Sequence, residues 1–243
     1  ELTADVLQED KDLLRELISV ISNWKNDLVS PKQAYALAKD AKYQTFAKCY
    51  ERYAAQIRAY NALDFDDLIM KTVQLFNKCP EVLEGYQNRL QYIMVDEYQD
   101  TNAAQFAFIK QLASKNQNLC VVGDDDQSIY KFRGADITNI LQFEKYFPNA
   151  RVVKLEQNYR STKNILEAAN SVIHNNAGRK DKTLWSDNEQ GDKIDLYQAE
   201  DGYAEAEMVA SEIKEKVDYG KADYNDYAIL YRTNAQSRAL EEK

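Results

Sequence analysis

The chain has 243 residues, of which 44% are hydrophobic, and a formal net charge of −9. That hydrophobic content supports packed cores and excludes a largely disordered chain, while a single histidine, His174, all but excludes histidine zinc sites and Ser-His-Asp triads. The acidic balance excludes nucleic-acid binding by overall charge, but it leaves room for a local basic surface, because residues 151–182 hold seven Lys/Arg against three Asp/Glu.

The sequence gives no sign of a membrane span or a disulfide framework. No apolar run approaches the roughly 18 residues that cross a bilayer. Cys49, Cys79 and Cys120 are odd in number and widely spaced. This pattern is typical of a reducing compartment, so we expect a cytoplasmic protein without a membrane partner.

Residues 1–62 are predicted to be helical. Ser30, Pro31 and Gln33 indicate a new helix start, with a capping serine, a proline in the first turn and a reciprocal glutamine. A further helix over residues 46–60 follows. The apolar residues of the first helix recur at spacings of three and four, namely Leu13, Leu14, Leu17, Ile18, Ile21, Trp24 and Leu28. The residues expected to face inward from the later helix are Phe46, Tyr53, Ile57 and Tyr60.

A strand–helix–strand unit is predicted next. Short apolar strands at residues 92–95 and 119–122 flank a helix at residues 103–114. The spacing suits a parallel pair with a crossover helix, so the residues that follow each strand should lie side by side. Before this unit, Asp64, Asp66 and Asp67 are best explained as acids at a helix N-terminus rather than as a metal site.

A second α/β unit is predicted after a boundary near residue 149. Helices are expected at residues 161–173 and 203–217. Three strands are expected around them, at residues 151–155, 194–197 and 227–231.

Three carboxylates follow the first strand. Asp96 at a strand end could hold a hydrated divalent cation, and Glu97 could then polarise an attacking water. The alternative is a polar turn in which Asp100 or Thr101 caps the next helix.

The second strand leads into Gly123, which could let the backbone approach a ligand closely. An acidic loop follows, and then Gln127, whose amide could sense a phosphate or position water. Aromatic and basic residues alternate directly afterwards, in Tyr130, Phe132 and Arg133. Such a run suits single-stranded nucleic acid, since aromatic rings stack on bases and cations meet phosphates. The alternatives are a solvent loop and ordinary core aromatics.

Tyr159 and Arg160 lie at a third strand-to-helix junction. Arg160 is placed as an arginine finger that reaches charge developing on a phosphate, and Tyr159 could stack on a nucleotide base. The alternative is an arginine paired with a carboxylate at a helix start.

Four stretches together resemble superfamily-one DNA helicases of the UvrD/Rep type. They are D-E-Y-Q-D-T, G-D-D-D-Q-S-I-Y-K-F-R-G-A-D, L-E-Q-N-Y-R-S-T and A-I-L-Y-R-T-N-A-Q-S-R. The resemblance implies an α/β fold made of parts of two RecA-like P-loop NTPase domains, with parallel sheets and flanking helices, plus an N-terminal all-helical insertion. It assigns residues 1–62 to insertion 1B, residues 63–150 to the second half of domain 1A and residues 151–243 to the first half of domain 2A.

The resemblance also implies roles for single residues, with ATP and Mg²⁺ as cofactors. Asp96 would bind magnesium and Glu97 would activate water. Gln127 and Arg160 would contact the γ-phosphate, and Tyr159 would stack on adenine. The single-strand path would be lined by Tyr130, Phe132 and Arg133.

The implied function is 3′-to-5′ translocation and unwinding in DNA repair and replication. The expected partners are single-stranded DNA, DNA junctions, and repair or transcription proteins. One departure from the family is Phe132, which stands where many relatives have tryptophan.

A larger departure is that no G-x-x-x-x-G-K-[ST] phosphate loop occurs in the sequence. We therefore expect a fragment of a helicase that is catalytically inactive alone. The alternatives are the motor portion of a RecB/AddA-type helicase-nuclease, a two-metal nuclease built from the acidic clusters, and a non-catalytic interaction module.

Overall fold

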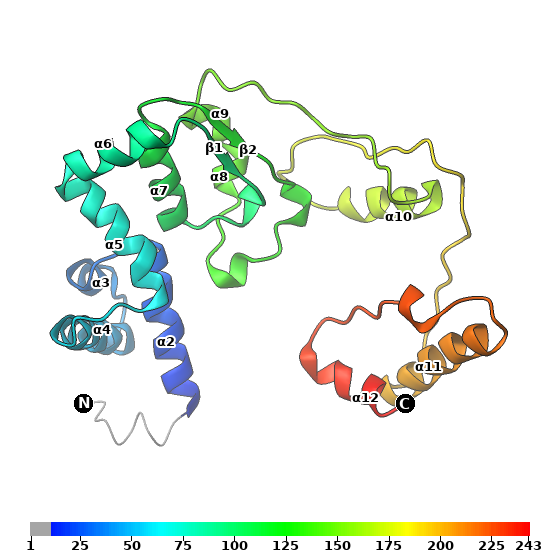
Figure 1. Cartoon of the computed structure of the whole chain (residues 1–243). Coiled ribbons are helices and arrows are strands. Elements are labelled where there is room, and N and C mark those ends of the chain that lie inside the picture. Colours follow the sequence, from blue (N-terminus) through cyan, green and yellow to red (C-terminus); the bar gives the residue numbers. More distant parts are fainter. Residues whose placement is uncertain (1–10) are drawn as a thin grey trace. The chain divides into compact units, whose positions relative to one another are not determined.

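A computed structural model describes residues 11–243 (Figure 1). The first ten residues of the predicted helical part lie outside the described residues. The described chain divides into two compact units. The first unit holds the described residues up to Glu156 together with Asn170–Leu184, and the second holds Gln157–Ala169 and Trp185–Lys243. Among the described residues, no helix has the length and apolar character needed to cross a membrane.

Four helices open the first unit, as the sequence predicts. Ser30 caps the second of them and accepts a hydrogen bond from the Gln33 amide, while the Gln33 side chain accepts one from the Ser30 amide at 2.9 Å, so the predicted capping box is confirmed. The third helix begins after the capping residue Asp40, earlier than predicted. The helices are α2 (Lys11–Asn26), α3 (Pro31–Leu37), α4 (Ala41–Ala59) and α5 (Phe65–Lys78).

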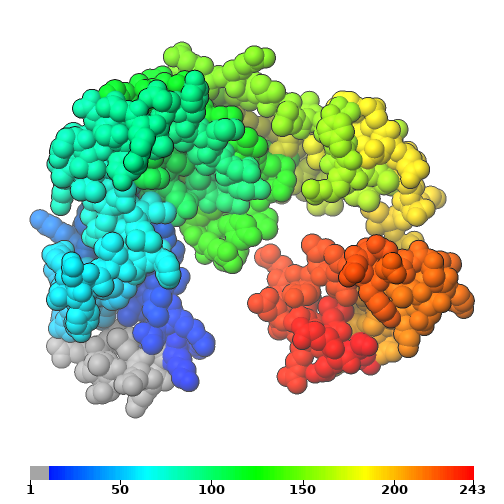
Figure 2. All heavy atoms as spheres, viewed as in Figure 1, coloured from blue at the N-terminus to red at the C-terminus, as the bar shows by residue number. Residues whose placement is uncertain are grey.

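The core of this helical part lies among α2, α3 and α4. Figure 2 shows the atoms of this part from outside, in blue to cyan. The central aromatic residue of the core is Tyr50, which is 1% exposed and stacks on Trp24 with ring centroids 5.9 Å apart. The inward prediction holds for Phe46, but it is wrong for Tyr53 and Tyr60, which are 37% and 71% exposed. Tyr53 lies on the same face of α4 as Phe46, but Tyr50 is the last buried core residue of this helix, and the Tyr53 hydroxyl donates to Asp64 Oδ2 at 2.7 Å instead.

A buried lysine ties α2 to the N-terminus of α5. Lys25 is only 2% exposed, and its Nζ lies 2.5 Å from Asp64 Oδ2 and 3.1 Å from Asp67 Oδ2. Asp64 also caps α5 through a 2.8 Å hydrogen bond from the Asp67 amide. The acids before α5 therefore start a helix, as predicted, and do not form an open metal site.

The predicted strand–helix–strand unit is confirmed. Strands β1 (Ile93–Val95) and β2 (Leu119–Val121) pair in parallel, with Met94 opposite Cys120, and α7 (Ala103–Ala113) connects them. Around the pair lie α6 (Pro80–Arg89), α8 (Thr138–Leu141) and α9 (Phe143–Tyr146). This arrangement supports an α/β class with a small parallel sheet and flanking helices.

The second α/β stretch contains its predicted helices but not its predicted strands. Residues 151–155, 194–197 and 227–231 are irregular. Leu155, Leu196 and Leu230 are 79%, 95% and 90% exposed. An apolar run favours a strand, but a strand forms only where a neighbouring strand pairs with its backbone hydrogen-bonding groups. Within the described chain, these runs have no such neighbour. The helices are α10 (Lys163–Ile173), α11 (Gly202–Asp218) and α12 (Ser237–Glu241).

Candidate functional site

The candidate site lies where β1 and β2 end, and backbone contacts bring the two following loops together. The Val122 amide donates to the Val95 carbonyl at 2.8 Å, and the Tyr98 amide donates to the Val122 carbonyl at 2.9 Å. The chain after β1 therefore folds across the end of β2. The predicted closeness of the two loops is confirmed.

Gln99 joins the two loops through its side chain. Its Nε2 donates to Glu97 Oε2 at 2.7 Å, and its Oε1 accepts from the Asp124 amide at 3.0 Å. The side chain is buried, with 1% exposure, and both ends of the amide have a partner, so its orientation is fixed. Sequence reasoning missed this residue. The available signal was an uncharged amide inside a run of carboxylates.

Gly123 is required by the same contact. A Cβ atom there would lie 2.6 Å from Gln99 Oε1 and 2.9 Å from Ile140 Cδ1. Sequence reasoning expected this glycine to let the backbone approach a ligand. The structure shows instead that the close approach is to Gln99, so the glycine supports the bridge between the loops.

Asp96 and Glu97 are both exposed at the end of β1. Asp96 Oδ1 accepts a hydrogen bond from the Glu97 amide at 2.9 Å. Glu97 has φ 49° and ψ 43°, a left-handed conformation that non-glycine residues rarely adopt. Strain of this kind persists only where the surroundings enforce it, and here Gln99 holds the glutamate side chain.

Asp100 does not cap the next helix. That cap is Asn102, whose Oδ1 accepts from the Gln105 amide at 2.9 Å, so the alternative with Asp100 or Thr101 as cap is wrong. Asp100 Oδ1 is buried and has no hydrogen-bond partner among the described residues. Burial, and then the charge of Glu97, raise the pKa of Asp100.

Gln127 directly follows the acidic loop, which we define as residues 124–126. Its Nε2 donates to Asp124 Oδ2 at 2.8 Å, so the amide is directed by this carboxylate. Burial alone would raise the pKa of Asp124, but hydrogen bonds from Lys182 and Gln127 outweigh burial and lower it. Asp124 therefore remains an anion that can accept from both neighbours.

The aromatic-basic run forms a small stacked group. The Arg133 guanidinium lies 5.0 Å from the Tyr130 ring centroid and 5.4 Å from that of Phe132. The Phe132 side chain is 75% exposed and Tyr130 is 36% exposed, so neither ring belongs to a buried core. An exposed ring beside a cation offers a stacking face and a charge to a nucleic-acid strand.

Tyr159 and Arg160 lie in the second compact unit. Tyr159 is 78% exposed, and its hydroxyl donates to Gln157 Oε1 at 2.8 Å. Asn158 Oδ1 accepts from the Arg160 amide at 3.0 Å, and within the described chain the guanidinium makes no ion pair. That Tyr159 and Arg160 contact a nucleotide bound beside Glu97 and Gln127 remains a prediction.

Two of the three acidic clusters are already paired with basic side chains. Lys25 pairs with the acids before α5, and Lys182 lies 2.8 Å from Asp125 and 3.2 Å from Asp126. Only the acids that follow β1 are left without a paired lysine or arginine in the described chain. This charge pairing disfavours a two-metal nuclease that uses all three clusters.

Sequence comparison places the chain among known proteins. The UvrD/REP helicase N-terminal domain matches residues 1–148, and the UvrD-like helicase C-terminal domain matches residues 153–243. The chain is 51% identical over 252 residues to the ATP-dependent DNA helicase PcrA of Bacillus subtilis (strain 168), covering 99% of this chain and 34% of that protein.

Further relatives give the same result. PcrA of Staphylococcus aureus (strain Mu50) is 58% identical over 228 residues, covering 94% of this chain and 31% of that protein. PcrA of Staphylococcus epidermidis is 57% identical over the same length. The chain thus spans between 31% and 34% of the length of these curated relatives.

Proposed function

The chain belongs to the UvrD/REP helicase family, and from this we propose that it is a segment of an ATP-driven motor that moves 3′ to 5′ along single-stranded DNA. We place the motor in the cytoplasm, in DNA repair and replication, acting on single strands and junctions with repair or transcription proteins as partners. Its architecture is two RecA-like P-loop NTPase domains with a helical insertion, divided near residues 62 and 150.

One observation carries the proposal. Glu97 and Gln127 follow two adjacent parallel strands, and Gln99 connects their loops, through 2.7 Å to Glu97 and 3.0 Å to the amide of Asp124. Hydrolysis of a phosphoanhydride needs one group to activate water and another to sense the terminal phosphate. Two side chains held at neighbouring strand ends supply that pair.

Each residue has a separate task in this proposal. Glu97 accepts the proton of the attacking water, and Gln127 donates an amide hydrogen bond to the γ-phosphate. Arg160 neutralises charge on that phosphate, and Tyr159 stacks on adenine. The single strand passes over the group made by Tyr130, Phe132 and Arg133.

Asp96 suits a hydrated magnesium ion. One of its oxygens accepts from the Glu97 amide, the other makes no hydrogen bond within the described residues, and the side chain is exposed. A carboxylate at a strand end with one available oxygen fits a cation that keeps most of its waters. When bound with ATP, magnesium would neutralise phosphate charge, and Asp96 would hold it there.

The water-activating role is tested by Glu97→Gln in the full-length protein that contains this chain. The substitution keeps the side-chain shape and removes the base. Nucleotide binding, measured with a fluorescent ATP analogue, should be retained, while DNA-stimulated ATP hydrolysis should fall by about 10²- to 10⁴-fold.

The matched control is Glu84→Gln. Glu84 is an exposed glutamate on α6 that pairs with Lys115 at 2.8 Å, so its substitution should leave hydrolysis unchanged. Hydrolysis at the wild-type rate in Glu97→Gln would remove Glu97 from the mechanism. A wild-type protein without DNA-stimulated hydrolysis would remove the proposed function itself.

The DNA-contacting role is tested by Phe132→Ala in the same protein. Losing one stacking ring should weaken oligothymidine binding by about 1–3 kcal/mol, as measured by fluorescence anisotropy. Tyr92→Ala is the matched control, because Tyr92 is 81% exposed and precedes β1, at the end of the strand opposite to the loops that follow β1 and β2. Equal affinities of the two variants would contradict the assignment.

A further inference from the structure

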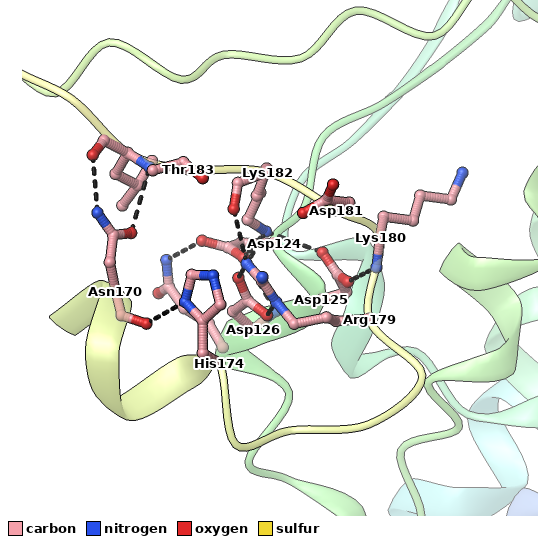
Figure 3. Close-up of polar contacts among 12 residues, drawn as sticks. Asp124, Asp125, Asp126, Asn170, His174, Arg179, Lys180, Asp181, Lys182 and Thr183 are labelled. Atoms are coloured by element: carbon pink, nitrogen blue, oxygen red, sulfur yellow. Dashed lines mark hydrogen bonds and ion pairs between the residues drawn. The ribbon is translucent and has the colours of Figure 1, made fainter.

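A lysine far along the chain reaches all three carboxylates of the acidic loop (Figure 3). Lys182 Nζ donates to Asp124 Oδ1, lies 2.8 Å from Asp125 Oδ1 and lies 3.2 Å from Asp126 Oδ2. Its side chain is 16% exposed, and those of Asp125 and Asp126 are 7% and 12% exposed. Charges this far removed from water act on one another more strongly than charges on an open surface.

The neighbours of Lys182 complete a basic segment, which we define as residues 179–182. The Arg179 guanidinium binds Asp126 with two hydrogen bonds, of 2.8 Å and 2.7 Å, and the Lys180 amide donates to Asp125 Oδ2 at 2.7 Å. A two-pronged arginine–carboxylate contact fixes angle as well as distance. The basic segment has no regular secondary structure, so side-chain contacts define its place on the loop.

The acidic loop by itself could be mistaken for a cation site, since three carboxylate oxygens lie within 4.8 Å of one another. The ammonium of Lys182 occupies the position from which a cation would reach them. The counter-ion of this loop is therefore a side chain of the same chain.

Asp124 passes this contact on to the candidate site. Its Oδ1 accepts from Lys182, and its Oδ2 accepts from Gln127 at 2.8 Å. Its backbone amide donates to Gln99, which in turn donates to Glu97. The carboxylate of Asp124 thus links Lys182 to Gln127. The backbone of the same aspartate is linked to Glu97 through Gln99.

We propose that Lys182 is a positioning residue for ATP hydrolysis: by holding Asp124, it fixes the direction in which the Gln127 amide points. This inference rests on the proposed function, because it concerns the same site. Lys182 touches no reacting atom in this account, and it acts through Asp124 alone. Arg179 supports it by holding Asp126, the other end of the loop.

The first test is the rate of DNA-stimulated ATP hydrolysis in the full-length protein that contains this chain. Lys182→Met should lower kcat by about 10- to 100-fold, the scale on which misplacing a catalytic group acts, while KM for ATP stays within about two-fold. Lys182→Arg, which keeps the charge, should restore most of the rate. A loss confined to KM, or no loss, overturns the proposal.

The matched control is Lys180→Met in the same basic segment. The Lys180 side chain pairs with Glu144 at 2.9 Å and does not touch the acidic loop, whereas its backbone contact is kept in the variant. Its kcat should equal that of the wild type. If Lys180→Met and Lys182→Met lose the same activity, local charge explains the effect and the positioning role is wrong.

The second test separates positioning from a general structural role. If Lys182 acts through Gln127, then adding Lys182→Met to Gln127→Ala should cause no further fall in kcat, whereas independent effects would multiply. Asp124→Asn, which keeps the shape of the intermediate group, should show the same lack of effect in the Gln127→Ala background. Multiplying losses overturn the proposal.

A third measurement gives a readout even if the protein hydrolyses no ATP. Hydrogen exchange of the Asp126 and Gln127 amides, which donate to Asp124, should be faster in Lys182→Met than in Lys180→Met. Unchanged exchange overturns the contact itself. Absent ATP hydrolysis in the wild type, with the exchange difference present, overturns the proposed function and leaves a structural clamp.

Discussion

Two lysines in the first compact unit each hold a group of aspartates, and they differ in what surrounds them. Lys25 is 2% exposed and joins two helices, because it lies in α2 and its partners Asp64 and Asp67 lie at the start of α5. Lys182 is 16% exposed and joins the irregular basic segment to the acidic loop, where Asp125–Gln127 form a single 3₁₀ turn.

Lysine–aspartate pairing therefore has a different effect in each cluster. Helices have their own backbone hydrogen bonds, so the Lys25 cluster adds stability to elements whose shape is already set. A single 3₁₀ turn and an irregular segment have few such bonds, so the Lys182 cluster contributes more to the shape of the loop that leads to Gln127. The comparison predicts a loss of stability from one cluster and a loss of orientation from the other.

The largest expected effect on stability follows from Lys25→Met. The substitution leaves two buried or half-buried carboxylates without their ammonium, and such a loss costs about 3–5 kcal/mol. Urea unfolding should show it, with Trp24 as the fluorescent reporter in a Trp185→Phe background. Equal destabilisation by Lys182→Met would erase the distinction between the clusters.

Lowering the pH is expected to have a smaller effect on stability, through the carboxylates of the acidic loop. Arg179 lowers the pKa of Asp126 against the opposing effect of burial, and burial is likewise outweighed at Asp124 by Lys182 and Gln127. A carboxyl whose folded pKa is lowered contributes stability that is fully present above its unfolded value of 3.8 and is lost as pH falls through the folded value.

The acidic loop should therefore keep its contacts from pH 7 down to about 3.8 and release them only below it. Trp185 follows the basic segment by three residues and can report the release in a Trp24→Phe background. A change of Trp185 emission centred between pH 5 and 6 would contradict the charge pairing described here.

The smallest effect is expected from Lys216→Ala. Lys216 pairs with Glu212 at 2.9 Å on the surface of α11, and both side chains are more than 40% exposed. Exposed pairs of this spacing contribute little, because water screens them and the side chains lose freedom. The urea midpoint should not move measurably, which sets the baseline for both clusters.

Local signals allowed much of the first unit to be predicted. The cap at Ser30 and the acids at the start of α5 depend on residues a few positions apart, and the β1–α7–β2 unit follows from the order of three local patterns, strand, helix and strand. All are confirmed. The bridge by Gln99 and the clamp by Lys182 were missed, since each depends on one side chain meeting a particular partner, 25 and 58 residues away, and no repeating pattern marks such a contact. Nothing in a local pattern states which distant carboxylate a given amide or lysine will meet.

The predictions of strands in the second α/β stretch are wrong for a related reason. The run 194–197 has the composition of a strand, but a strand exists only with a neighbour, and composition does not supply one. The inward prediction for Tyr53 failed for another reason: Tyr53 shares the face of Phe46, but the buried core of α2, α3 and α4 ends at Tyr50. The assigned roles of the site residues remain predictions.

The left-handed backbone at Glu97 has a consequence for how this protein can change. Glycine adopts that conformation without the penalty that a glutamate carries, and asparagine tolerates it better than most residues. Selection for thermal resistance alone should therefore favour Glu97→Gly or Glu97→Asn, at the expense of turnover. At this position, selection for stability and selection for ATP hydrolysis favour different residues.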